Sequence, residues 1–294
     1  MADLTTSYMG IELRNPLVVG ACSLSKNIDT IKQLEAAGAG ALVIKSLFEE
    51  QVQLERKEFE EAMETYDNMY GEALSMFPNV THGGPKEHLY WVTEARKAVE
   101  IPLFASLNAV NRDVWVDYAK QLAETGVDGL ELNFYSLPLD TELSSGDVEM
   151  RELEVFSRVR EAVKVPIAVK LHPNYTNLLH YVASLDRLGA DAVVLFNRLF
   201  SPDLNIESLE ETAPLVLSKS TDSLHSMRWA GLLFGRVQAD IVANTGVMSG
   251  RDALKMIAAG ADSVQIVSTL YKNKLTHIGA MLEEMTSWLD SKGY

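Results

Sequence analysis

The strongest constraint on the fold is a pattern that recurs eight times along the chain. Each unit begins with a short run rich in Val, Ile, Leu and Ala and continues into a longer stretch with helical periodicity. The apolar runs cover residues 17–23, 41–46, 102–107, 129–134, 166–171, 192–197, 240–245 and 263–268. Alternating strands and helices form parallel sheets, and eight such units with apolar strands predict a closed (β/α)8 barrel, the TIM barrel.

The segments between these runs support the same architecture. Residues 112–125 and 250–259 carry apolar side chains at the three- and four-residue spacings of a helix with one buried face. Residues 5–15 alternate around Met9-Gly10, which predicts an N-terminal β-hairpin that closes the bottom of the barrel. Because no linker or low-complexity tract divides the chain, we expect residues 1–294 to form a single domain.

Charge and cysteine content exclude several classes of function. The 294 residues include 41 acidic and 26 basic side chains, a formal charge of −15, and no basic cluster offsets this excess. Phosphates of nucleic acids and anionic membrane surfaces would be repelled, and no apolar run is long enough to span a bilayer. We therefore expect a cytoplasmic protein that binds neither. One cysteine, Cys22, can form neither an intrachain disulfide nor an iron–sulfur cluster.

Active sites of such barrels lie at the carboxyl ends of the strands, where the apolar runs become polar. The residues at these ends include Ala21, Cys22, Ser23, Lys45, Ser46, Ser106, Asn133, Lys170, His172, Asn197, Arg198, Thr245, Gly246 and Ser268. Lysines, asparagines and hydroxyls dominate this set, and the clustered His and carboxylate ligands of a hydrolytic metal site are missing from it. We therefore expect no metal. The turns after the seventh and eighth strands would open helices, which predicts a phosphate site.

The two lysines favour a function, although each has a simpler interpretation. A lysine at a strand end is often a solvated rim residue, and Asn133 and Asn197 could only cap loops. Lys45 and Lys170 each follow β-branched core residues, so each would be the first polar group above a packed layer. An unpaired ammonium is costly there, which favours a binding or catalytic role for the pair.

Taken in order, the strand-end motifs resemble those of the dihydroorotate dehydrogenases and related flavin mononucleotide (FMN) barrels, including that of dihydropyrimidine dehydrogenase. The likeness covers nearly the whole chain. It depends on the motifs MGIELRNPL from Met9, ACS from Ala21, GALVIKS from Gly40, LELN ending at Asn133, PIAVKL from Pro166, FN ending at Asn197, TGV from Thr245 and VQI from Val264.

This resemblance implies FMN as the cofactor and specific roles for the strand-end residues. Lys170 would lie by the pyrimidine edge of the flavin, and Gly246 and Ser268 would hold the phosphate. The full cofactor site would comprise Ala21, Ser23, Lys45, Ser46, Ser106, Asn133, Lys170, Asn197, Thr245, Gly246 and Ser268. Lys45, Asn133 and Asn197 would also contact substrate, and Ser136 stands where the family has its catalytic base, which leaves Ser136 and Lys45 as the catalytic candidates.

The sequence departs from the family pattern at several positions. Pro138 and Ala73 stand where the family has asparagines that bind the orotate ring, which argues against dihydroorotate itself as the substrate. Thr245 and Val267 replace glycines of the phosphate cradle, although backbone N–H groups survive such changes. An isolated serine is also a poor base, so Ser136 would need an activating neighbour.

Long loops are expected after strands two and four, at residues 47–85 and 135–148. Residues 49–65 predict an amphipathic helix that would serve as a lid or a dimer contact. We expect a homodimeric FMN-dependent oxidoreductase that acts on a CH–CH bond of a small dihydropyrimidine-like substrate, with a small molecule or a separate protein as electron acceptor. Two alternatives stay open: a Schiff-base lyase or aldolase on a phosphorylated substrate, and a flavin-binding barrel without catalysis.

Overall fold

A computed structural model describes residues 2–46, 85–108, 112–134, 140–198, 203–212 and 216–294, and its core is a closed parallel barrel. Around the barrel the strand order is β11-β12-β3-β4-β5-β6-β7-β8. The strands are β3 (Leu17–Val19), β4 (Ala41–Ile44), β5 (Leu103–Leu107), β6 (Gly129–Asn133), β7 (Ile167–Leu171), β8 (Ala192–Leu195), β11 (Asp240–Ala243) and β12 (Ser263–Ile266). The predicted (β/α)8 architecture is confirmed.

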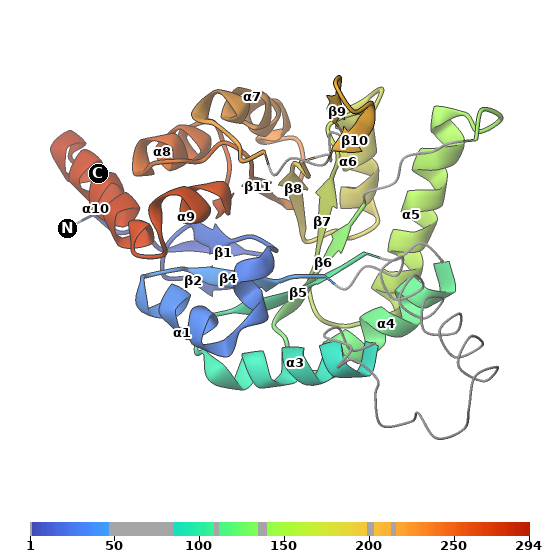
Figure 1. Cartoon of the computed structure of the whole chain (residues 1–294), viewed down its shortest axis with the longest axis horizontal. Helices are drawn as coiled ribbons and strands as arrows, with labels where there is room; N and C mark the ends of the chain where they lie inside the picture. Colours follow the sequence, from blue (N-terminus) through green and yellow to red (C-terminus); the bar gives the residue numbers. More distant parts are fainter. Residues whose placement is uncertain (1, 47–84, 109–111, 135–139, 199–202, 213–215) are drawn as a thin grey trace.

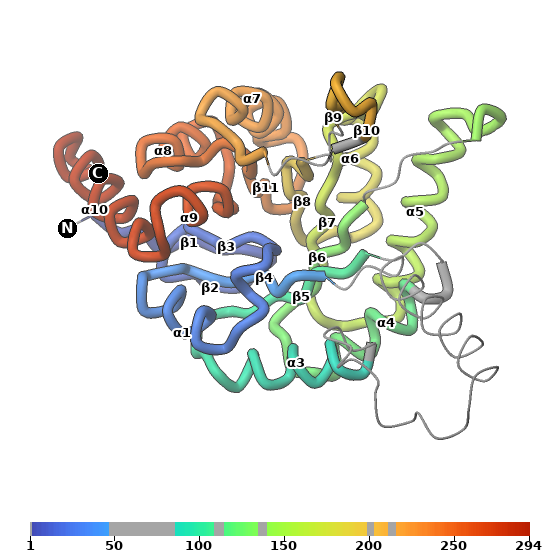
Figure 2. Tube along the Cα trace, in the orientation of Figure 1, coloured from blue at the N-terminus to red at the C-terminus, as the bar shows by residue number. Residues whose placement is uncertain are grey.

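Helices surround this barrel, as Figures 1 and 2 show. They are α1 (Ile28–Ala36), α3 (Pro85–Ala98), α4 (Arg112–Glu124), α5 (Ser145–Ala162), α6 (Leu178–Arg187), α7 (Ser223–Leu233), α8 (Gly250–Ala258), α9 (Ser268–Asn273) and α10 (His277–Lys292), with the short 3-10 helices η1 (Ser23–Lys26) and η2 (Ser220–Asp222). The expected helices at 112–125 and 250–259 correspond to α4 and α8. Glycines with positive φ, including Gly126 (86°) and Gly260 (113°), follow α4 and α8 as expected.

An N-terminal hairpin closes the bottom of the barrel. Strands β1 (Thr6–Tyr8) and β2 (Ile11–Leu13) pair in antiparallel fashion, and Met9 and Gly10 have φ of 55° and 73°. Two successive positive φ values are typical of the tight turns that match strand twist. Tyr8 is fully buried and packs edge-on against Phe104 of β5, with ring centroids 4.9 Å apart. The predicted hairpin plug is confirmed.

Aspartates that follow the helix-ending glycines fasten neighbouring strands at the same end. Asp128, Asp191 and Asp262 accept hydrogen bonds from backbone N–H groups in the first two residues of β5, β7 and β11, at 2.8, 2.7 and 2.7 Å. Two of them are also ion-paired: Arg96 with Asp128 and Arg160 with Asp191, at 3.0 and 2.9 Å. The Gly-Val-Asp and Gly-Ala-Asp joins therefore fix the relative heights of strands, which determines where the opposite ends of the strands lie.

The structure differs from the sequence expectations at a few boundaries. The first barrel strand ends at Val19, not at residue 23, and Ser23 begins η1. A further antiparallel hairpin, β9 (Asp203–Asn205) with β10 (Glu210–Thr212), follows β8 and was not predicted, because its exposed residues lack a periodic apolar pattern. The expected helix at 49–65 and most of both long loops lie outside the described residues. No helix among the described residues has the length and apolar character needed to cross a bilayer.

The environment of the Asp240 carboxyl, at the start of β11, predicts how the stability of the fold depends on pH. Its Oδ2 accepts a hydrogen bond from Met9 N–H at 2.7 Å, and burial, together with Asp262, raises its pKa to about 6. The folded state therefore holds a proton that the unfolded state has released between about pH 4 and pH 6, so stability falls as the pH rises through this window.

We expect Asp240→Asn to raise the free energy of unfolding near pH 7.5 by about 1 kcal/mol, a value reduced for solvent screening because Asp240 is half-buried. The asparagine side chain can still accept from Met9 N–H. Urea unfolding should show the gain shrink towards zero near about pH 4. The exposed control Glu12→Gln should show no such gain, and an equal gain at both pH values would contradict the assignment.

Candidate functional site

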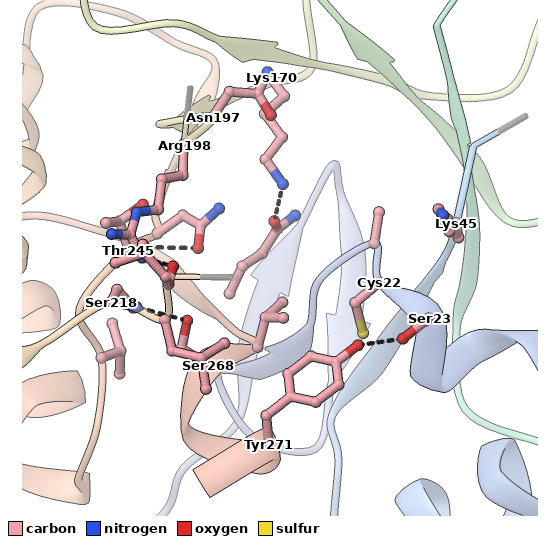
Figure 3. Close-up of a pocket in the computed structure, with 17 residues that line it drawn as sticks. Cys22, Ser23, Lys45, Lys170, Asn197, Arg198, Ser218, Thr245, Ser268 and Tyr271 are labelled. Atoms are coloured by element: carbon pink, nitrogen blue, oxygen red, sulfur yellow. Dashed lines mark hydrogen bonds between the residues drawn. The ribbon is translucent and has the colours of Figure 1, made fainter. Parts of the chain in front are cut away.

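A cavity of about 450 Å³ opens at the carboxyl ends of the strands (Figure 3). Of the residues predicted for a cofactor site, seven line it: Ala21, Ser23, Lys45, Lys170, Asn197, Thr245 and Ser268. They come from elements spread over almost the whole chain. The other lining residues are Cys22, Arg198, Val216, Leu217, Ser218, Asn244, Val247, Gln265, Val267 and Tyr271. Among these described residues, the charged side chains are all basic.

Strand alternation explains why polar side chains gather beneath this cavity. In the lower barrel, inward positions carry small and apolar residues such as Val43, Phe104 and Ala168. Side chains alternate between the two faces of a strand, so residues two positions further along also face inward. Those residues are Lys45, Ser106 and Lys170, and on β6 and β12 the equivalent inward residues are Glu131, Asn133 and Gln265. The inner layer therefore changes from apolar to polar as it approaches the mouth.

Lys170 is held by two buried partners. Its ammonium donates to Gln265 Oε1 at 3.0 Å and lies 3.6 Å from Glu131 Oε1, while Gln265 Nε2 donates to Glu131 Oε2. Lys170 is 7% exposed, and Glu131 and Gln265 are at most 1% exposed. In Figure 3 the Lys170 side chain extends into the pocket. The arrangement places one cation at a fixed point at the base of the cavity.

Another wall of the cavity is a strained turn after β11. Thr245 and Gly246 have φ of 71° and 78°, in the left-handed region that β-branched residues avoid. Thr245 thus keeps a glycine-like backbone conformation at the position where the sequence suggested a narrowed phosphate cradle. Gly246 N–H donates to Ser218 Oγ at 3.3 Å, and Ser218 N–H donates to Ser268 Oγ at 3.1 Å. Two hydroxyls and the turn backbone therefore meet at this wall.

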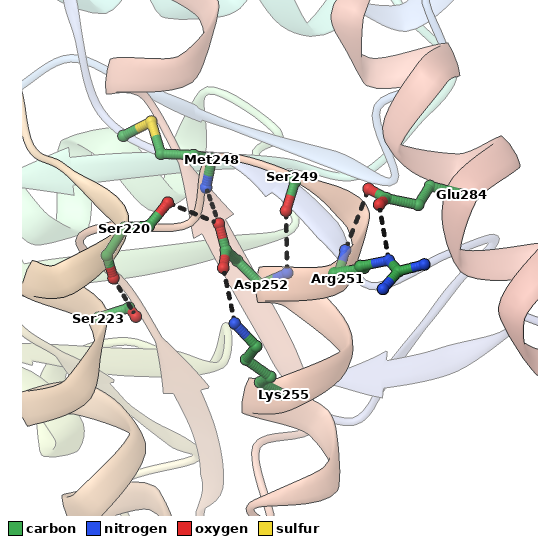
Figure 4. A network of polar contacts seen from close by, with 8 residues as sticks. All are labelled: Ser220, Ser223, Met248, Ser249, Arg251, Asp252, Lys255 and Glu284. Atoms are coloured by element: carbon green, nitrogen blue, oxygen red, sulfur yellow. Dashed lines mark hydrogen bonds and ion pairs between the residues drawn. The ribbon is translucent and has the colours of Figure 1, made fainter.

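Asp252 of α8 supports this turn from behind (Figure 4). Its carboxylate accepts from Ser220 Oγ at 3.0 Å and from Met248 N–H at 3.2 Å, and Lys255 lies 3.3 Å away. Burial opposes ionisation of Asp252, but these hydrogen bonds outweigh it and lower its pKa. A buried carboxylate with this many donors is well satisfied, so it stabilises the wall and does not face a ligand.

Lys45 enters the cavity at the end of β4, well apart from Thr245 in Figure 3. Partial burial, with nearby Lys26, lowers its pKa. His88 of α3 donates through Nε2 to the Lys45 carbonyl at 3.0 Å, which leaves Nδ1 to accept from the Tyr118 hydroxyl at 2.5 Å. Because burial lowers the pKa of His88, this neutral tautomer is the favoured form. The strand end that carries Lys45 is thereby fixed by two helices.

The remaining predicted residues fall into three groups. Asn133 accepts a hydrogen bond from Asn197 Nδ2 and pairs in register with Lys170, so it borders the cavity through these two residues. Gly246 contributes backbone to the turn, and neither it nor the buried Ser46 and Ser106 is part of the cavity lining. Ser136 lies outside the described residues.

Sequence reasoning missed several residues of this site. Glu131 and Gln265 each interrupt a buried apolar strand, and that interruption was the available signal, since such a position faces the barrel interior. Ser218 follows β10 at the end of a long excursion without a periodic pattern. Tyr271 of α9, whose hydroxyl lies 2.5 Å from Ser23 Oγ, looked like an ordinary helix residue. His172 instead stacks on Tyr175 at 4.1 Å and is not part of the lining.

Known proteins with similar sequences were found by comparison. The model of the dihydroorotate dehydrogenase family matches residues 3–289. The chain belongs to that family. Its members are oxidoreductases that act on CH–CH groups and depend on a flavin, generally FMN. The resemblance inferred from the strand-end motifs is therefore confirmed, and the chain is an enzyme of this class.

Individual relatives are distant but nearly full-length. The chain is 28% identical to the catalytic subunit of dihydroorotate dehydrogenase B (NAD(+)) from Thermoplasma volcanium, over 92% of this chain and 88% of the relative. The protein of the same name from Methanothermobacter thermautotrophicus is 29% identical over 90% of this chain and 86% of the relative. Dihydroorotate dehydrogenase A (fumarate) from Lactobacillus helveticus is 27% identical over 66% of this chain and 64% of the relative.

Within the described ranges, no group of three or more His, Cys, Asp or Glu side chains is placed to hold a metal ion. Cys22 lines the cavity as a buried thiol, and burial raises its pKa. The polar groups of the site are thus ammonium, guanidinium, amide and hydroxyl groups, which suit an organic anion.

The hydrogen bonds behind Lys45 predict a stability effect for this family member. Tyr118→Phe leaves the half-buried His88 Nδ1 without its donor, so we expect the free energy of unfolding to fall by about 1–2 kcal/mol. Urea denaturation measures the change. Tyr90→Phe, at an exposed position of the same helix as His88, is the control and should cost less than about 0.5 kcal/mol. Equal effects of the two substitutions would contradict the assigned hydrogen bond.

Proposed function

We propose that the chain, as one FMN-binding domain over residues 1–294, transfers a hydride between flavin N5 and a CH–CH bond of a small dihydropyrimidine-like substrate. The observation that carries this proposal is the buried Lys170 ammonium, fixed by Gln265 and Glu131 at the base of the cavity. A fixed cation stabilises the negative charge that a flavin gains over its N1 and C2 carbonyl edge on reduction.

The residues present fit FMN. The cavity volume lies within the range of pockets that hold small cofactors. Beside the glycine-like turn at Thr245 and Gly246, the Ser218 and Ser268 hydroxyls each accept a backbone N–H, so both O–H groups can still donate to a phosphate.

The roles of the site residues follow from this placement. Lys170 would bind the pyrimidine edge of the flavin, while Ala21, Ser23 and Asn197 would contact the ring system. Lys45 and the paired Asn133 and Asn197 would orient substrate. When bound, FMN supplies the hydride acceptor, and Ser136 is our candidate for the group that takes the substrate proton.

The charge of the cavity favours an anionic or strongly hydrogen-bonding substrate. Lys45, Lys170 and Arg198 line it, and no carboxylate does so among the residues that the structure describes. Because Ala73 and Pro138 replace asparagines of the family, we propose a dihydropyrimidine-like compound other than dihydroorotate. Both positions lie outside the described residues. The proposal also includes a cytoplasmic homodimer, for which the exposed Leu204, Ile206 and Leu209 of the β9–β10 hairpin provide apolar surface.

We expect the protein, refolded or expressed with excess flavin, to bind FMN more tightly than riboflavin, because riboflavin lacks the phosphate that the turn at Thr245 would hold. Lys170→Met should weaken FMN affinity at least about tenfold by removing a charge-assisted hydrogen bond. Quenching of FMN fluorescence measures both. The exposed control Lys164→Met should bind like wild type.

Failure of the wild-type protein to bind FMN would refute the proposed cofactor. Borohydride trapping of a phosphorylated aldehyde or ketone on Lys45 would instead support the lyase. Bound FMN that no dihydropyrimidine reduces would support a flavin-binding barrel without catalysis.

The identity of the electron acceptor can be tested separately. Relatives named as catalytic subunits of an NAD(+)-dependent enzyme imply a second subunit, and the single Cys22 leaves this chain without ligands for an iron–sulfur cluster. We expect NAD⁺ alone not to reoxidise the photoreduced, FMN-loaded chain in anaerobic stopped-flow spectroscopy, whereas ferricyanide should do so. Rapid reoxidation by NAD⁺ would show that the chain needs no partner for this step, and reoxidation by fumarate would favour a soluble acceptor.

A further inference from the structure

Glu131 is the least expected residue of the barrel interior. It lies in the middle of β6, in register with Ser106 of β5 and Ala168 of β7, and it is 0% exposed. A carboxylate so deeply buried is costly unless opposite charge and hydrogen bonds compensate it. The lining of the cavity does not include Glu131, so it has no direct route to a ligand there.

The contacts of Glu131 lead to a single cation. Gln265 Nε2 donates to Oε2, whereas Oε1 has no hydrogen-bond partner among the described groups and faces the Lys170 ammonium at 3.6 Å. The orientation of the Gln265 amide is forced, because a carboxylate only accepts and an ammonium only donates. Gln265 thus connects Glu131 to Lys170 a second time, through its Oε1 at 3.0 Å from the lysine.

No other carboxylate is ion-paired with Lys170 in the part of the chain that the structure describes. The other titratable groups near this pair are the Cys22 thiol, which feels the lysine charge, and the buried Tyr8 hydroxyl, which feels the charge of Glu131. Lys45 and Arg198 add further positive charge to the same cavity. A buried lysine among cations loses its proton readily unless a nearby anion retains it.

We propose that Glu131 is a positioning residue, which keeps Lys170 protonated and aimed into the cavity through direct charge and through Gln265. This inference rests on the proposed FMN site and deepens it. Lys170 then presents its positive charge to the flavin from a fixed position. In a variant without the Glu131 carboxylate, we expect the buried lysine to lose its proton more easily as the pH rises, because no close anion retains it.

Sulfite provides a readout that does not depend on the unknown substrate. It adds to N5 of oxidised flavin and leaves negative charge at the N1–C2 edge, so its affinity reports a cation there. We would titrate FMN-loaded wild type, Glu131→Gln, Glu131→Asp and Lys170→Met with sulfite at about pH 6 and about pH 8.5, a range in which a lysine with a lowered pKa titrates. Every affinity is taken relative to wild type at the same pH.

We expect Glu131→Gln to bind sulfite roughly tenfold more weakly than wild type at the higher pH and to approach wild type at the lower pH, since one pKa unit corresponds to a tenfold change. Glu131→Asp keeps a carboxylate and should lose less. Lys170→Met should be weak at both pH values. Recovery of sulfite affinity at the lower pH in Glu131→Gln, and a smaller loss in Glu131→Asp, would indicate that Glu131 acts through its charge. A packing defect would instead lower the affinity at both pH values.

Several results would overturn the inference. Wild-type sulfite affinity in Glu131→Gln at both pH values would show that Lys170 needs no counter-charge. A loss independent of pH would assign Glu131 to packing, and tighter sulfite binding would show that Glu131 weakens the cation. If Glu131→Gln does not fold, the same pH comparison on Glu131→Asp decides. If wild type binds no FMN, the proposed function fails, whereas FMN binding with any of these sulfite results refutes only the role of Glu131.

Discussion

Closure of the parallel sheet is the constraint on which the rest of this structure depends. Once β11 pairs with β12 and with β8, every strand has two neighbours, and alternate side chains must enter a sealed interior. The lower part of that interior is filled by Val43, Phe104 and their neighbours, with Tyr8 of the hairpin as a plug. The charged and amide side chains of the interior lie at the upper inward positions, near the mouth.

The two ends of the barrel use charge differently. At the bottom, Asp128, Asp191 and Asp262 accept from N–H groups in the first two residues of neighbouring strands, so these carboxylates fix strand heights. At the mouth, the charged side chains that line the cavity within the described ranges are basic, although the chain as a whole carries −15. Local arrangement, not net charge, therefore decides which ligand the mouth favours, because interactions between exposed distant charges are screened by solvent and salt.

Much of this arrangement was predictable. Short apolar runs followed by helical periodicity located all eight barrel strands, because parallel strands are buried on both faces, and the turn at Met9-Gly10 predicted the hairpin. Lys45 and Lys170 were found because each follows β-branched core residues, where an unpaired ammonium above a packed layer is costly. Ser218 and Tyr271 were not, since their places in the lining result from a long excursion after β8 and from a helix turned towards Ser23.

The sequence by itself determined the fold class, the family and the strand ends that would hold polar groups, because these depend on local periodicity and on residue type. Only the tertiary structure decided which of those groups meet. Glu131, Lys170 and Gln265 come from β6, β7 and β12, and barrel closure brings them within hydrogen-bond or ion-pair distance. Their sequence separations carry no record of that contact, since it arises from strand register and curvature, which the whole sheet sets together.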